Sequence, residues 1–136
     1  MTPKKMIYSK FPTVELIATD EYKGYEYAVV NYGTHPCCYV KLYRDHPFFG
    51  HDHNRISLSC HGGLTYSKNH VQAISDNLDS DGWWIGWDYA HAGDYVSYFS
   101  REEGINLKRW STEELIEDCQ YVIDQVVEAA EEVVEQ

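Results

Sequence analysis

Alternating apolar and polar positions predict a β-hairpin near the start of the chain. Apolar and β-branched residues alternate with polar ones over residues 14–22 and again over residues 25–32, and Lys23-Gly24 lies between the two runs. A period of two and a short glycine-containing link are typical of two strands joined by a tight turn. Residues 37–43 form a third predicted strand, after a turn at residues 33–36 that contains Gly and Pro.

Shorter runs in the middle of the chain predict further strands. Residues 55–60 alternate again, and we expect them to pair with residues 64–67 across Gly62-Gly63. The aromatic run at residues 83–87 predicts a buried strand, and residues 95–99 predict another.

The last 25 residues predict a long amphipathic helix. Ser111-Thr112-Glu113-Glu114 forms a capping box, in which Ser111 and Glu114 satisfy each other's free backbone N–H groups. Apolar residues then recur with helical spacing over about six turns. The predicted fold class is therefore α+β: a single domain over residues 1–136, mainly an antiparallel sheet, with the C-terminal helix packed on it.

The opposite face of this helix is acidic, and the whole chain carries a net charge of −11. No Lys or Arg lies within the helix to form pairs four residues away. Such a charge opposes direct binding to nucleic acid and suits a basic protein surface, although the face could also be solvated or meet a second copy of the chain in a homodimer. The predicted contact residues are Glu113, Glu117, Asp124 and Glu128.

The composition predicts a folded protein with an aromatic core. Hydrophobic residues make up 43% of the 136 residues and aromatic residues 15%, and no stretch approaches the roughly 20 apolar residues of a membrane span. We expect a cytoplasmic protein whose four cysteines are reduced. Cys37 and Cys38 are adjacent in a predicted strand, so they should point to opposite faces.

The seven histidines all lie between residues 35 and 91, several of them close to carboxylates and glycines. Neutral imidazole and carboxylate are zinc ligands, and a further carboxylate, here Asp94, can orient a ligating ring. We predict a structural, mononuclear zinc site. Its first three ligands would be His61, Asp88 and His91, and its fourth would be either His46 or Cys37. The same residues could instead form a purely hydrogen-bonded centre.

Catalytic signatures are weak by comparison. The chain lacks a G-x-S-x-G elbow and a phosphate-binding loop, and Cys60 and His61 would face apart in a strand. The alternative function is a metal-dependent hydrolase or sponge for a small nucleotide immune signal, with Trp83, Trp84 or Trp87 stacking on the base. Few Lys and Arg lie near the histidines to hold its phosphates.

Several short pieces of the chain, spread over roughly residues 24 to 95, resemble a family of small phage and prophage proteins from Gram-positive bacteria. The specific pieces have the patterns H-G-G-L-T-Y, at residues 61–66, and W-x-G-x-D-x-x-H-x-G-D, at residues 84–94. Tyr39-Val40 and His46-Pro47 also match. The chain departs from the pattern at residues 34–38, so the resemblance does not extend to His35 and Cys37 as site residues.

This resemblance implies a function in anti-defence. Phage proteins of this size and acidity include anti-CRISPR inhibitors of Cas9, and the resemblance points to the zinc-containing type II-A group. It therefore implies a zinc cofactor and a Cas9 partner in the host bacterial cytoplasm. An acidic surface would then occupy a basic, nucleic-acid-handling region of the partner.

Overall fold

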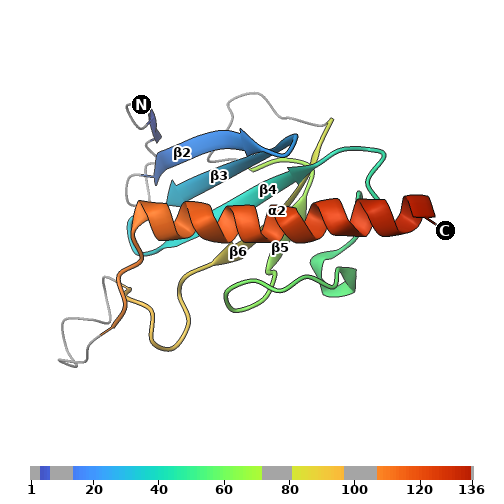
Figure 1. Cartoon of the computed structure of the whole chain (residues 1–136). Helices are drawn as coiled ribbons and strands as arrows, with labels where there is room; N and C mark the ends of the chain where they lie inside the picture. Colours follow the sequence, from blue (N-terminus) through green and yellow to red (C-terminus); the bar gives the residue numbers. More distant parts are fainter. Residues whose placement is uncertain (1–3, 7–13, 72–80, 97–106, 136) are drawn as a thin grey trace.

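An antiparallel sheet of six strands, in the order β1-β2-β3-β4-β6-β5, carries the long helix α2 on one face (Figure 1). The computed structural model describes residues 4–6, 14–71, 81–96 and 107–135. This arrangement confirms the predicted α+β class. The elements are β1 (Lys4–Met6), β2 (Val14–Tyr22), β3 (Tyr25–Asn31), β4 (Pro36–Leu42), the 3-10 turn η1 (His53–Arg55), β5 (Tyr66–Lys68), β6 (Trp83–Asp88) and α2 (Thr112–Glu135).

The predicted hairpin and the third strand are confirmed. Strands β2 and β3 pair from Glu15–Asn31 to Tyr22–Tyr25, and β4 pairs with β3. The link between β2 and β3 has positive φ at both residues, 50° at Lys23 and 87° at Gly24. This is the left-handed geometry that a two-residue hairpin turn requires.

Two other predicted strands, at residues 55–60 and 95–99, are not found in the described residues. Residues 56–60 form no strand, although β5 is the edge strand of the sheet and pairs only with β6. The Ser59 N–H donates to Gln125 Oε1 and the Ser59 carbonyl accepts from Gln125 Nε2–H, both at 2.8 Å, so a side chain of α2 takes the backbone groups that would pair with β5. The strand predicted at residues 64–67 is confirmed as β5, but its partner is β6 and not residues 55–60. Residues 95 and 96 form no strand either, and the rest of that predicted strand, 97–99, lies outside the described residues.

The central strands are buried on both faces. Cys38 and Val40 belong to the core under α2, whereas Cys37 and Tyr39 belong to a second apolar cluster on the other face. The prediction that the adjacent cysteines face apart is confirmed. Burial on both sides also explains why β6 reads as a continuous apolar run rather than an alternating one.

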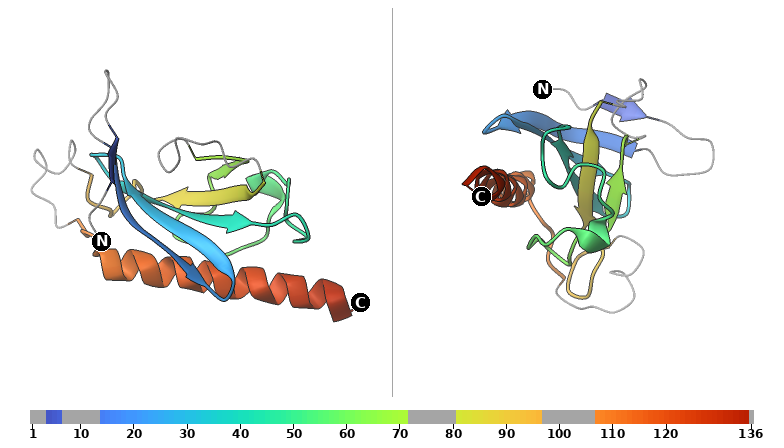
Figure 2. Two further views of the ribbon diagram at one scale, coloured as in Figure 1. Left: turned by 90° about the horizontal axis from the view of Figure 1, so that it is seen from above. Right: turned by 90° about the vertical axis from the view of Figure 1, so that its right-hand side faces the viewer.

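Helix α2 begins with the predicted capping box. The Glu114 N–H donates to Ser111 Oγ (3.1 Å), and the Ser111 N–H donates to Glu114 Oε1 (3.0 Å). Figure 2 shows the helix lying against one side of the sheet. Its buried side chains are Leu115, Cys119, Val122, Ile123 and Val126. Among the described residues no helix is long and apolar enough to cross a membrane.

Candidate functional site

Three segments that are far apart in sequence meet beside the N-terminal end of α2. They are the glycine turn at residues 60–63, the turn after β6 at residues 89–94, and residues 108–110, which lead into the helix. Two backbone hydrogen bonds join the last two segments: Lys108 N–H to the Gly93 carbonyl (2.8 Å) and Tyr95 N–H to the Lys108 carbonyl (2.9 Å). The entry of the helix is thereby tied to the end of β6.

Asp94 lies at the centre of this junction and is 5% exposed. Its Oδ2 accepts from His61 Nε2–H (2.7 Å) and from the His91 backbone N–H (3.0 Å), and its Oδ1 accepts from Trp110 Nε1–H (2.9 Å). One carboxylate thus receives a donor from each of the three segments. We call Asp94, His61, His91 and Trp110 the buried carboxylate cluster.

These donors keep Asp94 ionised. Burial raises the pKa of Asp94, but hydrogen bonds from His61, the His91 amide and Trp110 together outweigh it, so the pKa lies below the ordinary value of 3.8. A buried carboxylate with three donors contributes stability that is present above pH 4 and is lost as the pH falls below its ordinary pKa. The cluster is therefore a stabilising junction of the fold.

Aromatic rings enclose the imidazole of His61. It stacks on Tyr89 with 4.7 Å between ring centroids and an interplanar angle of 7°, and it meets the edge of Trp110 at 4.9 Å. Tyr89 is itself held by Asp118 of α2, which accepts from the tyrosine hydroxyl at 2.6 Å. These contacts fix the ring of His61 in position, with its Nε2 directed at Asp94.

His91 lies against Gly62 and close to Asp88. The Nε2 atom of His91 is buried and 3.2 Å from Asp88 Oδ1, but the two lack the alignment of a hydrogen bond. The same Nε2 would lie only 2.1 Å from a Cβ placed on Gly62, whose φ is +70°. Glycine at this position is what lets the two turns approach so closely.

The structure does not gather the four residues predicted to bind zinc into one group of ligands. Over residues 14–71, 81–96 and 107–135, no group of three or more His, Cys, Asp or Glu side chains is arranged to hold a metal ion. Asp94, predicted to orient a ligand, does contact His61, and Asp88 does approach His91. The predicted zinc site therefore has no support in the geometry of the described residues and stays a prediction.

His46, the predicted fourth ligand, is used elsewhere. Its Nε2–H donates to the Val126 carbonyl of α2 (2.8 Å), and its Nδ1 accepts from the Phe48 N–H (3.0 Å), so neither nitrogen is available to a metal. Burial lowers the pKa of His46 below 6.5 by more than the hydrogen bond to Val126 and the charge of Asp45 raise it. His46 therefore packs neutral beneath the helix. The other expected fourth ligand, Cys37, is buried in the second apolar cluster.

Nucleophilic chemistry at Cys60 is also disfavoured. Burial raises the pKa of the Cys60 thiol to about 12, so the thiolate that would attack a substrate is scarce at neutral pH. The alternative function as a metal-dependent nucleotide hydrolase requires a metal site, and the described residues offer no group of three ligating side chains for one.

The sequence interpretation missed Trp110 and Tyr89 as members of this region. A signal was present for Trp110, because an apolar residue directly before a capping box often packs against the first turn of the helix. Trp110 and Leu115 do lie in one apolar cluster. No local signal marks Tyr89, whose role depends on a contact with Asp118 from α2.

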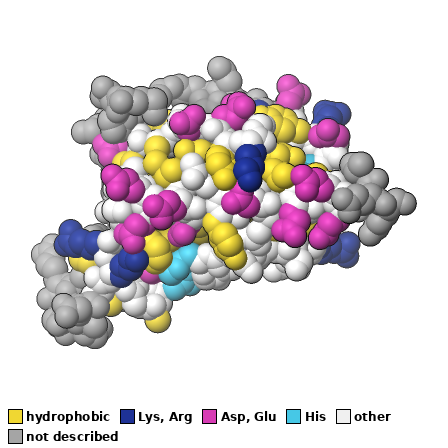
Figure 3. Space-filling model, in the orientation of Figure 1, with side chains coloured by type: hydrophobic (Ala, Val, Ile, Leu, Met, Phe, Trp, Pro, Cys, Tyr) yellow, Lys and Arg dark blue, Asp and Glu magenta, His cyan; other side chains and the backbone are white. Residues whose placement is uncertain are grey.

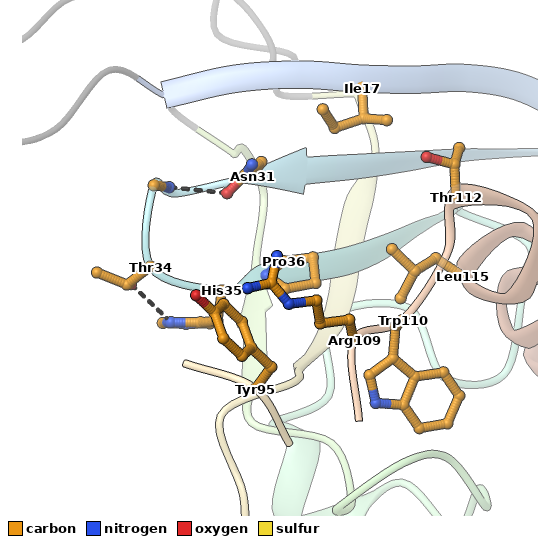
Figure 4. Close-up of a pocket in the computed structure, with 11 residues that line it drawn as sticks. Ile17, Asn31, Thr34, His35, Pro36, Tyr95, Arg109, Trp110, Thr112 and Leu115 are labelled. Atoms are coloured by element: carbon orange, nitrogen blue, oxygen red, sulfur yellow. Dashed lines mark hydrogen bonds between the residues drawn. The ribbon is translucent and has the colours of Figure 1, made fainter. Parts of the chain in front are cut away.

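A hollow of about 280 Å³ lies near the start of α2, and Trp110 lines it together with residues of β2 and of the turn before β4 (Figure 4). Arg109 lies over the ring of Tyr95 at 3.7 Å from the ring centroid, and both residues line the hollow. Thr34 and His35 contribute its polar side, joined by a 2.9 Å hydrogen bond. No buried, unpartnered polar group points into this hollow from the described residues.

The predicted contact residues Glu113, Glu117, Asp124 and Glu128 are all exposed on α2. With Glu131 and Glu132, which are also exposed, they make up what we call the acidic face. Figure 3 shows acidic side chains spread along the side of the molecule on which the helix lies. Within the described part of the chain, only Asp124 of this set forms an ion pair, with Lys23 at 2.8 Å.

Comparison of the chain with protein-family models, with curated proteins and with solved structures found no match. The phage-protein resemblance therefore stays a prediction.

Proposed function

We propose that this protein acts by binding a basic surface of another protein through the acidic face of α2. The observation that carries the proposal is the number of unpaired acids on that face. Six carboxylates are exposed there, and only one of them has an ion-pair partner among the described residues. The sheet covers the opposite side of the same helix. The charge is thus presented outward on a rigid element.

The buried carboxylate cluster supports this proposal indirectly. Asp94 accepts from His61, from the His91 backbone N–H and from Trp110, and these bonds join three segments of the fold. Because they tie the start of α2 to the sheet, they hold the helix that carries the acidic face. Complementary charge speeds association and orients the partners, while a few apolar anchors supply most of the affinity.

Cas9 is the partner that the phage-protein resemblance nominates, and an acidic protein suits a region that normally holds nucleic acid. We propose that binding there, in the bacterial cytoplasm, blocks DNA loading or cleavage. No metal is part of this proposal.

Cleavage assays with purified proteins test this proposal. The protein in excess over guide-loaded Cas9 should reduce DNA cleavage and co-elute with Cas9, and the double variant Glu117→Lys/Glu128→Lys should lose both effects. The control Glu21→Lys/Asp81→Lys makes the same change in net charge at exposed positions outside α2 and should retain them. Unchanged cleavage with the wild-type protein would exclude Cas9, and equal behaviour of the two double variants would exclude the acidic face.

The homodimer alternative predicts a different salt dependence. Two acidic faces repel each other, so a dimer through them would form only when salt screens the charges, whereas binding to a basic partner weakens as salt rises. Light scattering of the protein alone at about 0.05 M and 1 M salt separates the two cases.

A further inference from the structure

A second hollow of about 280 Å³ lies between α2 and the turn that carries His61. We call it the Tyr121 hollow. It opens beside the acidic face, and its walls come from the helix, from the turn and from the segment before the helix. The lining residues are Ser59, Cys60, His61, Trp110, Asp118 and Tyr121.

Tyr121 gives this hollow an aromatic wall that faces solvent. It is the one large hydrophobic side chain that is exposed among the described residues, at 54%. Tyrosine on a helix flanked by charged residues is typical of an anchor in protein recognition, since its ring supplies contact area at little cost in conformational entropy. Tyr121 lies one helical turn after Glu117, at the edge of the acidic face.

Asp118 gives the hollow a fixed negative charge. Its Oδ2 accepts from the Tyr89 hydroxyl, which in turn accepts from Trp87 Nε1–H at 2.9 Å. These contacts hold the carboxylate in place. Its Oδ1 has no hydrogen-bond donor, and the carboxylate no ion pair, in the part of the chain that the structure describes.

We infer that the Tyr121 hollow receives an arginine side chain of the partner. A planar guanidinium stacks on aromatic rings and donates to carboxylates, and this hollow offers two aromatic residues and a carboxylate with an unoccupied oxygen. The inference rests on the proposed function and names the group that the partner inserts.

The chain already uses the same chemistry nearby. Lys108 Nζ lies 3.9 Å from the ring centroid of Trp110, and the guanidinium of Arg109 lies 3.7 Å from that of Tyr95. Lys108 does not line the Tyr121 hollow, so its contact leaves the hollow open. An anionic ligand is disfavoured there, because Asp118 and the neighbouring Glu117 would repel it.

Peptide titration tests the inference without the full partner. The probes are three capped pentapeptides, Gly-Gly-X-Gly-Gly, in which X is arginine, lysine or citrulline, and the readout is the Trp110 indole NMR signal, assigned with Trp110→Phe. We expect the arginine peptide to bind most tightly, and the citrulline peptide, which has the shape without the charge, to bind least.

Three variants locate the binding. Tyr121→Leu and Asp118→Asn should each weaken binding of the arginine peptide roughly tenfold, the size expected for a cation–π contact and for a charged hydrogen bond. Glu128→Gln removes an acid from the same helix outside the hollow and should change the affinity by less than about twofold. Thermal unfolding controls for folding, and Tyr121 is exposed enough that its replacement should not unfold the protein.

The outcomes separate the inference from the proposed function. Equal affinity for arginine and lysine peptides, or equal weakening by all three variants, would overturn the arginine site while leaving the acidic face as a general docking surface. Loss of Cas9 binding in Tyr121→Leu supports both. Retained Cas9 binding in Glu117→Lys/Glu128→Lys overturns the proposed function, whatever the peptides show.

Discussion

In the buried carboxylate cluster, one carboxylate receives three donors, whereas on the acidic face five of six exposed carboxylates form no ion pair with any described residue. Both regions lie on or beside α2, and both are built from charged groups. Asp94 is directed inward and joins three segments of the chain. The acids of the acidic face are directed outward, and apart from the Asp124–Lys23 pair they form no ion pair within the described fold.

This difference teaches which charges hold the molecule and which are available to a partner. Removing a buried, hydrogen-bonded carboxylate leaves its donors without partners inside the protein, whereas water can replace any contact of an exposed one. Stability should therefore respond to changes in the cluster and binding to changes on the acidic face. Four experiments test that division.

The largest effect on stability should come from Asp94→Asn. The amide keeps one acceptor oxygen but presents its own N–H groups where His61, Trp110 or the His91 amide now donates. We expect unfolding by denaturant to show a loss of about 3 kcal/mol. Glu117→Gln on the acidic face makes the same chemical change and should alter stability by less than about 0.5 kcal/mol. Similar losses in the two variants would remove the distinction between the regions.

A second test uses the two adjacent glycines of the turn that carries His61. Both have positive φ, but a Cβ at Gly62 would collide with His91, whereas a Cβ at Gly63 meets nothing within 4 Å. Gly63→Ala should therefore cost about 1 kcal/mol from backbone strain alone, and Gly62→Ala about 1–2 kcal/mol more. The difference in thermal unfolding between the variants measures how tightly His91 packs in the cluster. Equal costs would show that His91 is free to move away.

Much of the fold could be predicted from the sequence because its signals are local. The hairpin at Lys23-Gly24 and the capping box at Ser111 each depend on neighbours within a few residues, and both are confirmed. Strand pairing is not local. Residues 55–60 alternate like a strand but do not join the open edge of β5, since the backbone of Ser59 is hydrogen-bonded to Gln125 of α2, 66 residues away in sequence.

For the candidate site, the sequence indicates which residues lie together better than it indicates how they interact. His61, His91, Asp88 and Asp94 do lie together, and the spacing of the Asp and His residues around a glycine turn was enough to indicate this. Their chemistry depends on a donor from outside the pattern: Trp110 takes Oδ1 of Asp94. His46 was misplaced because composition cannot show that its two nitrogens bond to backbone groups beneath α2.

A third and smaller effect on stability should come from the titration of His46, which is buried beneath α2. His46 is neutral in the fold with a lowered pKa, so the unfolded chain gains a proton near pH 6.5 that the folded chain does not accept. Stability should fall as the pH drops below 6.5, by at most about 1.4 kcal/mol per pH unit. In His46→Gln the amide can donate to Val126 and accept from Phe48 without titrating. This variant should therefore lose less stability than the wild type between pH 7 and pH 5. Parallel curves would show that His46 takes up its proton within the fold.

The smallest effect on stability, and of opposite sign, should come from Glu128→Lys. Glu128 lies four residues from Asp124 and from Glu132, so it has a like charge on each side along the acidic face, and it lies in the half of α2 where the helix dipole favours cations. Replacing it should stabilise the protein by about 0.5 kcal/mol while weakening its binding to a basic partner. Thermal unfolding and partner titration at low salt measure the two quantities on the same sample. A variant that gains stability and loses binding would show that these acids are retained for recognition at the expense of the fold, whereas unchanged binding would identify them as a solvated surface.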